Sequence, residues 1–310
     1  MNMQNNKPRI LGFVGATASG KTSLALEVAK HLPCEILCMD SMQIYRGMDI
    51  GTAKPTAAEQ SIAPHHMIDI VDPADSYSVA QYVDSAHHLI ADILSRNHVP
   101  VLVGGTGLYL QGLSLPMNYG GLPSDPAMRQ QLTNDLAQIG PEMLHARLQS
   151  VDPITAARLH PNDTRRVIRA LEIFHLTGTP MSQHKTPTDA DSPYQFSLYA
   201  IDWPRAELHQ RINLRVDLMM KNGLLDEVER LVRSGVPADA QSMQGLGYKE
   251  LLPVLSNKAA LPSAVEQIKT GTRNYARRQL IWFRRDKRIE WIDKEHLPTA
   301  AEHIINNWRE

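Results

Sequence analysis

The clearest chemical signature in the sequence is a short glycine-bearing stretch near the start of the chain. Residues 15–22, GATASGKT, match the spacing G-x-x-x-x-G-K-[ST] and lie between an apolar run and a helical pattern. In such a loop, backbone N–H groups and the following helix N-terminus converge on anionic oxygens. Lys21 would neutralise an outer phosphate, and the Thr22 hydroxyl would hold Mg²⁺. The stretch therefore predicts a site for a phosphorylated ligand, without specifying the reaction.

Two further polar turns follow apolar runs that we expect to be strands. Asp40 follows residues 35–39, and Thr106 lies in the glycine turn 104–107 after residues 99–103. Ligands of open α/β sheets bind at the carboxyl ends of the strands, so both residues are expected beside the phosphate loop. From position alone, Asp40 is equally suited to capping a turn. The second glycine turn is likewise compatible with tight packing alone.

A basic segment near the C-terminus carries a different kind of signal. Residues 273–288 contain seven Arg or Lys residues and one Asp, with Tyr275, Trp282 and Phe283 interleaved. Backbone phosphates attract such a cluster, and aromatic rings stack on unpaired bases. The alternative is a solvated helix with Trp282 and Phe283 in the core. Because the chain has a formal net charge of −1, any nucleic-acid surface must be a local patch.

The elements that position these residues alternate between strands and helices, except in one segment. Apolar runs of strand length recur at 10–14, 35–39, 99–103, 198–202 and 289–292. Residues 126–183, which follow a Gly- and Pro-rich stretch, read as helices only. We therefore predict an α/β fold: a P-loop NTPase-like parallel sheet flanked by helices, with an inserted all-helical domain. The expected core comprises residues 1–117 and 199–310, and the expected insertion comprises residues 118–198.

Composition limits the class of protein. The chain has 310 residues, 43% of them hydrophobic and 21% charged, which is typical of a soluble protein with more than one compact part. Two cysteines, Cys34 and Cys38, imply no disulfide framework. The polar N-terminal segment lacks the apolar core of a signal peptide, and no run is long enough to span a membrane. We expect a cytoplasmic protein, with the pairs His65-His66 and His87-His88 serving packing rather than metal binding.

Seven stretches taken together resemble the tRNA dimethylallyltransferase family, also called tRNA isopentenyltransferases. They are GATASGKT at 15–22, DSMQIYRGMDIGTAKPT at 40–56, PHHMIDIVDP at 64–73, GGTGLYL at 104–110, HPNDTRRVIRALEIFHLTGTP at 160–180, GLGYKE at 245–250 and RRQLIWFRRD at 277–286. The resemblance covers nearly the whole chain, and the order of the motifs is highly specific. The chain departs from the family pattern at Ala16, where the family usually has proline; we expect slightly lower rigidity of the loop and unchanged chemistry.

The resemblance implies a reaction and a set of roles. The family transfers the dimethylallyl group of dimethylallyl diphosphate to N6 of the adenine just 3′ of the anticodon, position 37, releasing diphosphate. The phosphate loop would then bind an isoprenoid diphosphate together with Mg²⁺ on Thr22. Asp40 resembles the general base, and Thr106 resembles the residue that touches the reacting amine or the diphosphate. Arg215, with Arg211, resembles the diphosphate-binding arginine.

The resemblance also implies the partners. The helical insertion would grip the tRNA anticodon stem-loop, and we expect a monomer that binds no membrane. The diphosphate-binding residues would be Gly15, Ala16, Thr17, Ala18, Ser19, Gly20, Lys21, Thr22 and Arg211. The tRNA-binding residues would be Asp40, Ser41, Met42, Gln43, Thr106, Arg129, Asn162, Asp163, Thr164, Arg165, Arg166, Gln244, Gly245, Leu246, Gly247, Tyr248, Lys249, Arg277, Arg278, Gln279, Leu280, Ile281, Trp282, Phe283 and Arg284.

Three other functions compete with this interpretation. A small-molecule kinase of the phosphate-loop class would turn over nucleotide but gives no role to the basic segment. A non-catalytic RNA-binding module leaves the phosphate loop unexplained. A relative that prenylates free AMP would not need the long helical insertion. Incubation with labelled dimethylallyl diphosphate and either tRNA or free nucleotide separates these alternatives.

Overall fold

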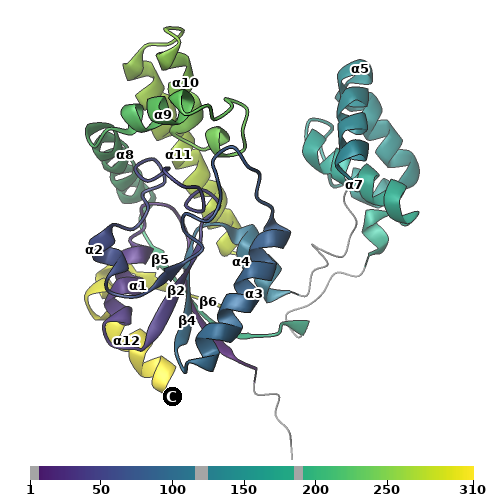
Figure 1. Ribbon diagram of the computed structural model, residues 1–310. Helices are drawn as coiled ribbons and strands as arrows, with labels where there is room; N and C mark the ends of the chain where they lie inside the picture. The colour runs from purple at the N-terminus through teal and green to yellow at the C-terminus, as the bar shows by residue number, and fades with distance from the viewer. Residues whose placement is uncertain (1–6, 116–124, 185–190) are drawn as a thin grey trace, which may run out of the picture. The chain divides into compact units, whose positions relative to one another are not determined.

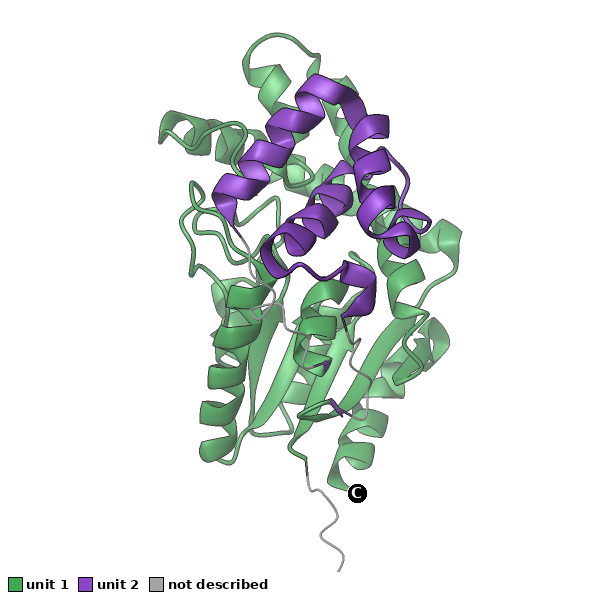
Figure 2. Ribbon diagram, turned by 90° about the vertical axis from the view of Figure 1, so that its right-hand side faces the viewer, with its two compact units in different colours: residues 1–114, 192–310 green, residues 115–191 purple. Residues whose placement is uncertain are grey.

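The chain divides into two compact units. The computed structural model describes residues 7–115, 125–184 and 191–310. Unit 1 comprises residues 1–114 and 192–310, and unit 2 comprises residues 115–191 (Figure 2). The boundary expected at 117–118 lies outside the described residues. The boundary expected at 198 falls inside strand β5, whose pairing with β1 begins at Gln195, so the second limit moves to 192.

Unit 1 is built on a six-stranded sheet in the order β3-β2-β4-β1-β5-β6. All of the pairings between these strands are parallel, as predicted. The strands are β1 (Arg9–Val14), β2 (Cys34–Met39), β3 (His65–His66), β4 (Val99–Gly104), β5 (Gln195–Asp202) and β6 (Ile289–Asp293). The central strands are buried on both faces, which explains why they read as continuous apolar runs rather than as alternating ones.

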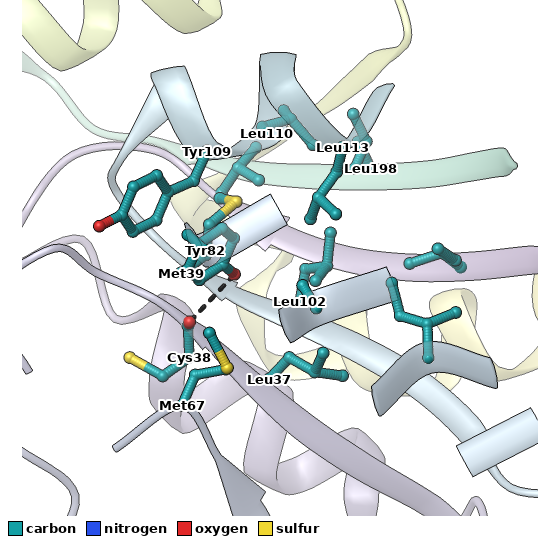
Figure 3. Packing of buried hydrophobic residues seen from close by; sticks show 14 of the residues in the cluster. Leu37, Cys38, Met39, Met67, Tyr82, Leu102, Tyr109, Leu110, Leu113 and Leu198 are labelled. Carbon is teal, nitrogen blue, oxygen red and sulfur yellow. Dashed lines mark hydrogen bonds between the residues drawn. The ribbon is translucent and has the colours of Figure 1, made fainter. Parts of the chain in front are cut away.

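Helices cover both faces of this sheet. Helices α1 (Lys21–Ala29) and α12 (Leu297–Arg309) pack on one face, and α3 (Val79–Ser95) and α4 (Gly107–Ser114) pack on the other. Figure 3 shows the second face, where the Tyr82 hydroxyl donates to the Cys38 carbonyl among buried leucines. The rings of Tyr82 and Tyr109 stack with centroids 3.8 Å apart, which fixes α3 against α4.

A third apolar core lies beyond the sheet, within the same unit. It joins the loop of residues 44–71 to four helices: α8 (Arg205–Lys221), α9 (Leu224–Arg233), α10 (Tyr248–Leu255) and α11 (Leu261–Phe283). Figure 1 shows these helices gathered at the carboxyl end of the strands. The loop also contains the short helix α2 (Ala57–Gln60), which begins with a capping box of Thr56 and Glu59. The ligand edge of the sheet is thus covered by a helical group of its own unit.

Unit 2 contains only helices in its described part, as predicted for this segment. They are α5 (Pro126–Val151), α6 (Pro153–Ala156), α7 (Thr164–Thr177) and the 3₁₀ turn η1 (Met181–Gln183). Helix α5 is kinked at Gly140, which has a φ of 78° and precedes Pro141. The fully buried Glu172 of α7 accepts hydrogen bonds from the guanidinium groups of Arg129 and Arg169. A buried carboxylate needs such partners, so this cluster holds α5 against α7.

Candidate active site

The phosphate loop connects β1 to α1 in an unusual backbone conformation. Gly15, Ala18 and Gly20 have positive φ values of 122°, 61° and 95°. Two groups reach this loop from the chain after β5: Trp203 Nε1 donates to the Ser19 carbonyl at 2.8 Å, and Arg211 Nε donates to the Ala18 carbonyl at 2.9 Å. The left-handed conformation of Ala18 costs about 1–2 kcal/mol, so a surrounding structure must hold it. These two hydrogen bonds hold the loop in this shape.

The polar groups of this loop are arranged for an anion. Lys21 Nζ donates to the Ala16 carbonyl at 3.2 Å, and burial together with the charge of Arg215 lowers the pKa of Lys21 to about 8. Asp40 opposes this shift. Burial also lowers the pKa of Arg215, again opposed by Asp40. The Ser19 hydroxyl is buried and has no hydrogen-bond partner in the described parts of the chain. Two desolvated cations and an unpaired hydroxyl are a combination that a phosphate group would satisfy.

The turns after β2 and β4 meet as the sequence predicts. The Ser41 N–H donates to Thr106 Oγ1 at 3.1 Å, and the Thr106 N–H donates to the Met39 carbonyl at 3.1 Å. Asp40 Oδ1 accepts the Met42 N–H at 2.9 Å, so Asp40 does cap its turn. The carboxyl also lines both pockets described next, so capping does not exhaust its possible role.

Two pockets share four lining residues: Thr17, Asp40, Thr52 and Arg215. The larger of the two has a volume of about 310 Å³, within the size range of small-molecule sites, and is lined by apolar, aromatic and polar side chains together with the loop 244–249. The smaller, about 60 Å³, adds Lys21 and Thr22 to the shared residues. A third pocket of about 430 Å³ lies over Lys21, Thr22, Arg211 and Arg215. The pocket that contains Lys21 and Thr22 thus shares Asp40 and Arg215 with the larger pocket of this pair.

Helix α11 divides its predicted tRNA-binding residues between surface and core. Arg277 and Arg278 are exposed, and Arg278 also lines the larger pocket. Trp282 and Ile281 are 40% and 45% exposed. Phe283 is fully buried in the sheet core, which agrees with the alternative that its ring is a core side chain. A helix with one face on a core must bury every third or fourth side chain, and Phe283 belongs to that buried stripe.

Other residues in the predicted set use their polar groups inside the protein. Gln43 Nε2 donates to the carbonyls of Thr52 and Ala53. The buried Tyr248 donates its hydroxyl to Glu227 Oε1 at 2.7 Å. Arg284 forms an ion pair with Asp202 at 2.8 Å, and its guanidinium lies 4.9 Å from the centre of the Trp291 ring. The other predicted residues of the loop 244–249, which contains Tyr248, line the larger pocket: Gln244, Gly245, Leu246, Gly247 and Lys249.

In unit 2, the predicted residues lie at the start of α5 and of α7. Arg129 forms an ion pair with Glu172 at 2.9 Å while half of its side chain stays exposed. Asn162, Arg165 and Arg166 are exposed. Asp163 occupies the N-cap of α7 but makes no capping hydrogen bond; its carboxylate instead pairs with Arg166 at 3.1 Å.

Three residues of the site were not given their roles by sequence reasoning. Glu227 accepts the N–H groups of the 49–51 loop, and Tyr275 and Gln279 face the two glycine turns. Burial raises the pKa of Tyr275. In the sequence, Glu227 looks like any carboxylate on a helix. Its backbone partners lie 176–178 residues away, so no local pattern indicates its role. The cations and aromatic residues of 273–288 had pointed to this helix, but they indicated nucleic-acid binding and gave no sign of the contacts that Tyr275 and Gln279 make with the two turns.

No cluster of three or more metal-ligating side chains occurs in residues 7–115, 125–184 and 191–310. Cys34 and Cys38 are buried and unpaired with each other. His66 instead lies 2.7 Å from the Glu35 carboxylate, and His87 lies 2.6 Å from the Tyr194 hydroxyl. These contacts place one histidine of each pair in a polar interaction with a neighbouring side chain. Within the same ranges, no helix has the length and apolar content to cross a bilayer.

Comparison with known proteins gives consistent matches along the chain. The family model described as IPP transferase matches residues 43–286, and the model described as isopentenyl transferase matches residues 8–69. The tRNA dimethylallyltransferase of Bacillus subtilis (strain 168) is 46% identical over 291 residues, covering 94% of this chain and 92% of the relative. That of Pelotomaculum thermopropionicum is 45% identical over 296 residues, covering 96% of this chain and 94% of the relative.

Solved structures agree with these matches. The full-length tRNA isopentenylpyrophosphate transferase of Bacillus halodurans is 41% identical with a TM-score of 0.72, covering 97% of this chain and 96% of that one. A eukaryotic dimethylallyltransferase described as acting on tRNA is 27% identical with a TM-score of 0.81, covering 97% of this chain and 80% of that one. The similarity therefore includes both units and is not limited to the phosphate loop.

Proposed function

The chain belongs to the tRNA dimethylallyltransferase family, and we propose that its phosphate loop, Asp40 and Arg215 carry out the reaction. The reaction transfers the dimethylallyl group of dimethylallyl diphosphate to N6 of adenine 37, next to the tRNA anticodon. The observation that carries the assignment of residues is that the anion-binding groups and the larger pocket share Asp40 and Arg215. Membership of this family excludes two of the alternatives, the small-molecule kinase and the non-catalytic RNA-binding module.

The leaving group is the part of the substrate that the phosphate loop serves. The C–O bond to diphosphate breaks as the new C–N bond forms, so negative charge develops on the diphosphate. The loop N–H groups, the Ser19 hydroxyl, Lys21 and Arg215 would stabilise this charge in a site already shaped for it. Arg211, which braces Ala18 and lines the outer pocket, would support the same group.

The nucleophile requires a proton acceptor. An exocyclic adenine amine has a delocalised lone pair, and its proton becomes acidic only as the C–N bond forms. Asp40 would accept this proton, while Thr106, held against Ser41, would orient the amine. The adenine must leave its stack to reach the allylic carbon, so the larger pocket would receive a flipped base. Exclusion of water from this pocket would protect the allylic centre from hydrolysis.

A magnesium ion fits the donors that are present. Thr22 and Asp40 both line the smaller pocket, and a hydroxyl with a carboxylate are the oxygen ligands that Mg²⁺ accepts beside phosphate oxygens and water. Thr22 would hold the ion, and the ion would supply further neutralisation of the diphosphate.

The tRNA would be held by both units. We propose that unit 2 grips the anticodon stem-loop, with exposed Arg165 and Arg166 directed to phosphates. In unit 1, Arg277, Arg278 and the half-exposed Trp282 would contact the RNA. The enzyme would act as a monomer, in the cytoplasm, where tRNA is found.

The test uses labelled dimethylallyl diphosphate with three acceptors: unmodified tRNA, the same tRNA with guanine at position 37, and free AMP. We expect label in the first only, with one diphosphate released per transfer. Transfer to AMP at a comparable rate would contradict the proposed acceptor. Nucleotide hydrolysis without prenyl transfer would contradict the assignment of the phosphate loop.

A further inference from the structure

The side chain of Gln279 connects the two glycine turns of unit 1. It lies on α11 and is 5% exposed. Its Oε1 accepts the Thr17 N–H of the phosphate loop at 2.9 Å, and its Nε2 donates to the Gly105 carbonyl of the second turn at 2.9 Å. Both bonds run to backbone groups, so they fix the paths of the two turns rather than the positions of side chains. Both the oxygen and the nitrogen of the Gln279 amide therefore form hydrogen bonds within the protein.

The composition of the second turn matches this arrangement. A Cβ at position 105 would lie 2.1 Å from Gln279 Nε2 and 3.1 Å from the Gly15 carbonyl. Only glycine allows the amide and the two turns to approach so closely. At position 107, a Cβ would similarly meet the Trp282 ring at 2.2 Å. Two glycines of the GGTG motif are thus required by the packing of α11, which differs from a role in anion binding.

In the proposed reaction, one of the two turns holds the leaving group and the other lies beside the nucleophile. The phosphate loop would hold the leaving group, while Thr106, adjacent to Gly105, accepts the Ser41 N–H next to Asp40. A displacement at carbon requires the nucleophile, the carbon and the leaving group to be aligned, and a misplacement of about 1 Å can cost about 100-fold in rate. The bond pair of Gln279 sets the separation of these two sides.

We propose that Gln279 is a positioning residue that holds the diphosphate loop and the amine-binding turn at the separation needed for transfer. The inference rests on the proposed roles of the phosphate loop, Asp40 and Thr106. It also replaces the predicted role of Gln279 as a tRNA contact, because its buried amide is already engaged at both ends. Helix α11 then combines two tasks: Arg277 and Arg278 face tRNA, and the next residue positions the chemistry.

The informative variant is Gln279→Glu, which keeps the size of the side chain. An ionised carboxylate still accepts the Thr17 N–H but cannot donate to the Gly105 carbonyl; a protonated carboxyl does both. At pH 8 we expect single-turnover transfer about 10–100-fold slower than in the parent. Dissociation constants for tRNA and dimethylallyl diphosphate should stay within about twofold. Burial at this position should raise the pKa of the introduced carboxyl. The ratio of parent to variant rate should therefore shrink as the pH falls toward 6, because protonation restores the second bond.

Two companion variants separate positioning from packing. Gln279→Met removes both bonds at similar volume, so its rate should be low and its deficit constant with pH. Gln267→Glu places the same charge on an exposed part of α11 and should follow the parent throughout. Melting curves at each pH identify any variant that does not fold. If Gln279→Glu is unfolded, the rate of Gln279→Met alone tests the inference.

Transfer by Gln279→Met at the rate of the parent would overturn the inference. The inference would also be overturned if Gln279→Met and Gln279→Glu were slower than the parent by the same factor at every pH. A parent enzyme that transfers nothing to tRNA would instead contradict the proposed function.

Discussion

Lys21 links the electrostatics of the site to a measurable pH dependence. Its pKa of about 8 results from burial and from Arg215, so the free protein carries this charge below pH 8 and loses it above. A bound diphosphate favours the charged form and raises the pKa of Lys21. Affinity for dimethylallyl diphosphate should therefore be highest below pH 8 and fall by up to about tenfold per pH unit above it.

The measurement is a binding titration of dimethylallyl diphosphate between pH 7 and 9.5. Lys21→Met should bind more weakly and lose this part of the pH dependence, while any titration of the ligand itself appears equally in parent and variant. Parallel pH profiles for parent and Lys21→Met would contradict the role of the lysine charge.

Asp40 allows general-base catalysis to be separated from turn capping. Asp40→Asn retains an oxygen that can accept the Met42 N–H, so the turn should persist and thermal stability should change little. Loss of the proton acceptor should slow single-turnover transfer by about 10²–10⁴-fold, with both substrates still bound. The matched control is Asp75→Asn in the exposed loop before α3. A parent-like rate in Asp40→Asn would refute the base assignment, and recovery at high Mg²⁺ would indicate an effect on the ion.

The residues found from sequence differ from those missed in how far their partners lie along the chain. The phosphate loop could be identified because its whole function is encoded in eight consecutive residues that a strand and a helix flank. Gln279 could not, because its partners at Thr17 and Gly105 are 262 and 174 residues away and are backbone groups. Any residue type supplies a backbone N–H or carbonyl, so the residue types at 17 and 105 do not reveal these bonds. The exception is the glycine at 105, which the close approach of Gln279 requires.

At the scale of elements, hydrophobic periodicity predicted the long helices and the central strands well. The apolar run at 99–103, for example, corresponds to strand β4, which spans Val99–Gly104. The two-residue strand β3 and the four-residue helix α2 were missed, because so few residues cannot show a repeating pattern. The limit at 198 was misplaced because strand β5 begins with polar and half-buried residues at its edge, where the apolar run has not yet started.

Helix α9 stabilises the pocket through one buried carboxylate. Glu227 accepts the N–H groups of Asp49, Ile50 and Gly51 at 2.8–3.0 Å and the Tyr248 hydroxyl. Glu227→Ala leaves these donors without a partner, so the free energy of unfolding should fall by about 2–4 kcal/mol. Because Gly51 and Tyr248 both line the larger pocket, tRNA affinity should fall as well.

Urea denaturation and tRNA binding below the melting temperature test this prediction. Glu229→Ala serves as the control, since Glu229 lies on the same helix, has a partly exposed side chain and pairs across one turn with Arg233 among the bonds described here. It should change the free energy of unfolding by less than about 0.5 kcal/mol. Equal stability of the two variants would remove Glu227 as the anchor of the 49–51 loop.

At the scale of the whole molecule, a chain of net charge −1 must bind a polyanion through local patches. Exposed cations on α11 and on α7 provide such patches, one in each unit. Each neutralised phosphate releases counterions, so tRNA affinity should fall steeply and linearly on a double-logarithmic salt plot, with a slope of about −0.7 to −0.9 per phosphate contacted. Affinity for dimethylallyl diphosphate, which binds in a small desolvated pocket, should depend much less on salt.

Charge reversal distinguishes a local patch from the overall charge. Arg277→Glu should weaken tRNA binding and reduce the magnitude of the salt slope by about one, while leaving the dissociation constant of dimethylallyl diphosphate unchanged. Arg309→Glu alters the net charge of the chain by the same amount at the end of α12, which packs with α1 against the sheet. If overall charge governed binding, both variants would lose affinity equally. If the patch on α11 governs it, only Arg277→Glu should change the slope, and an unchanged slope in that variant would exclude Arg277 from the tRNA interface.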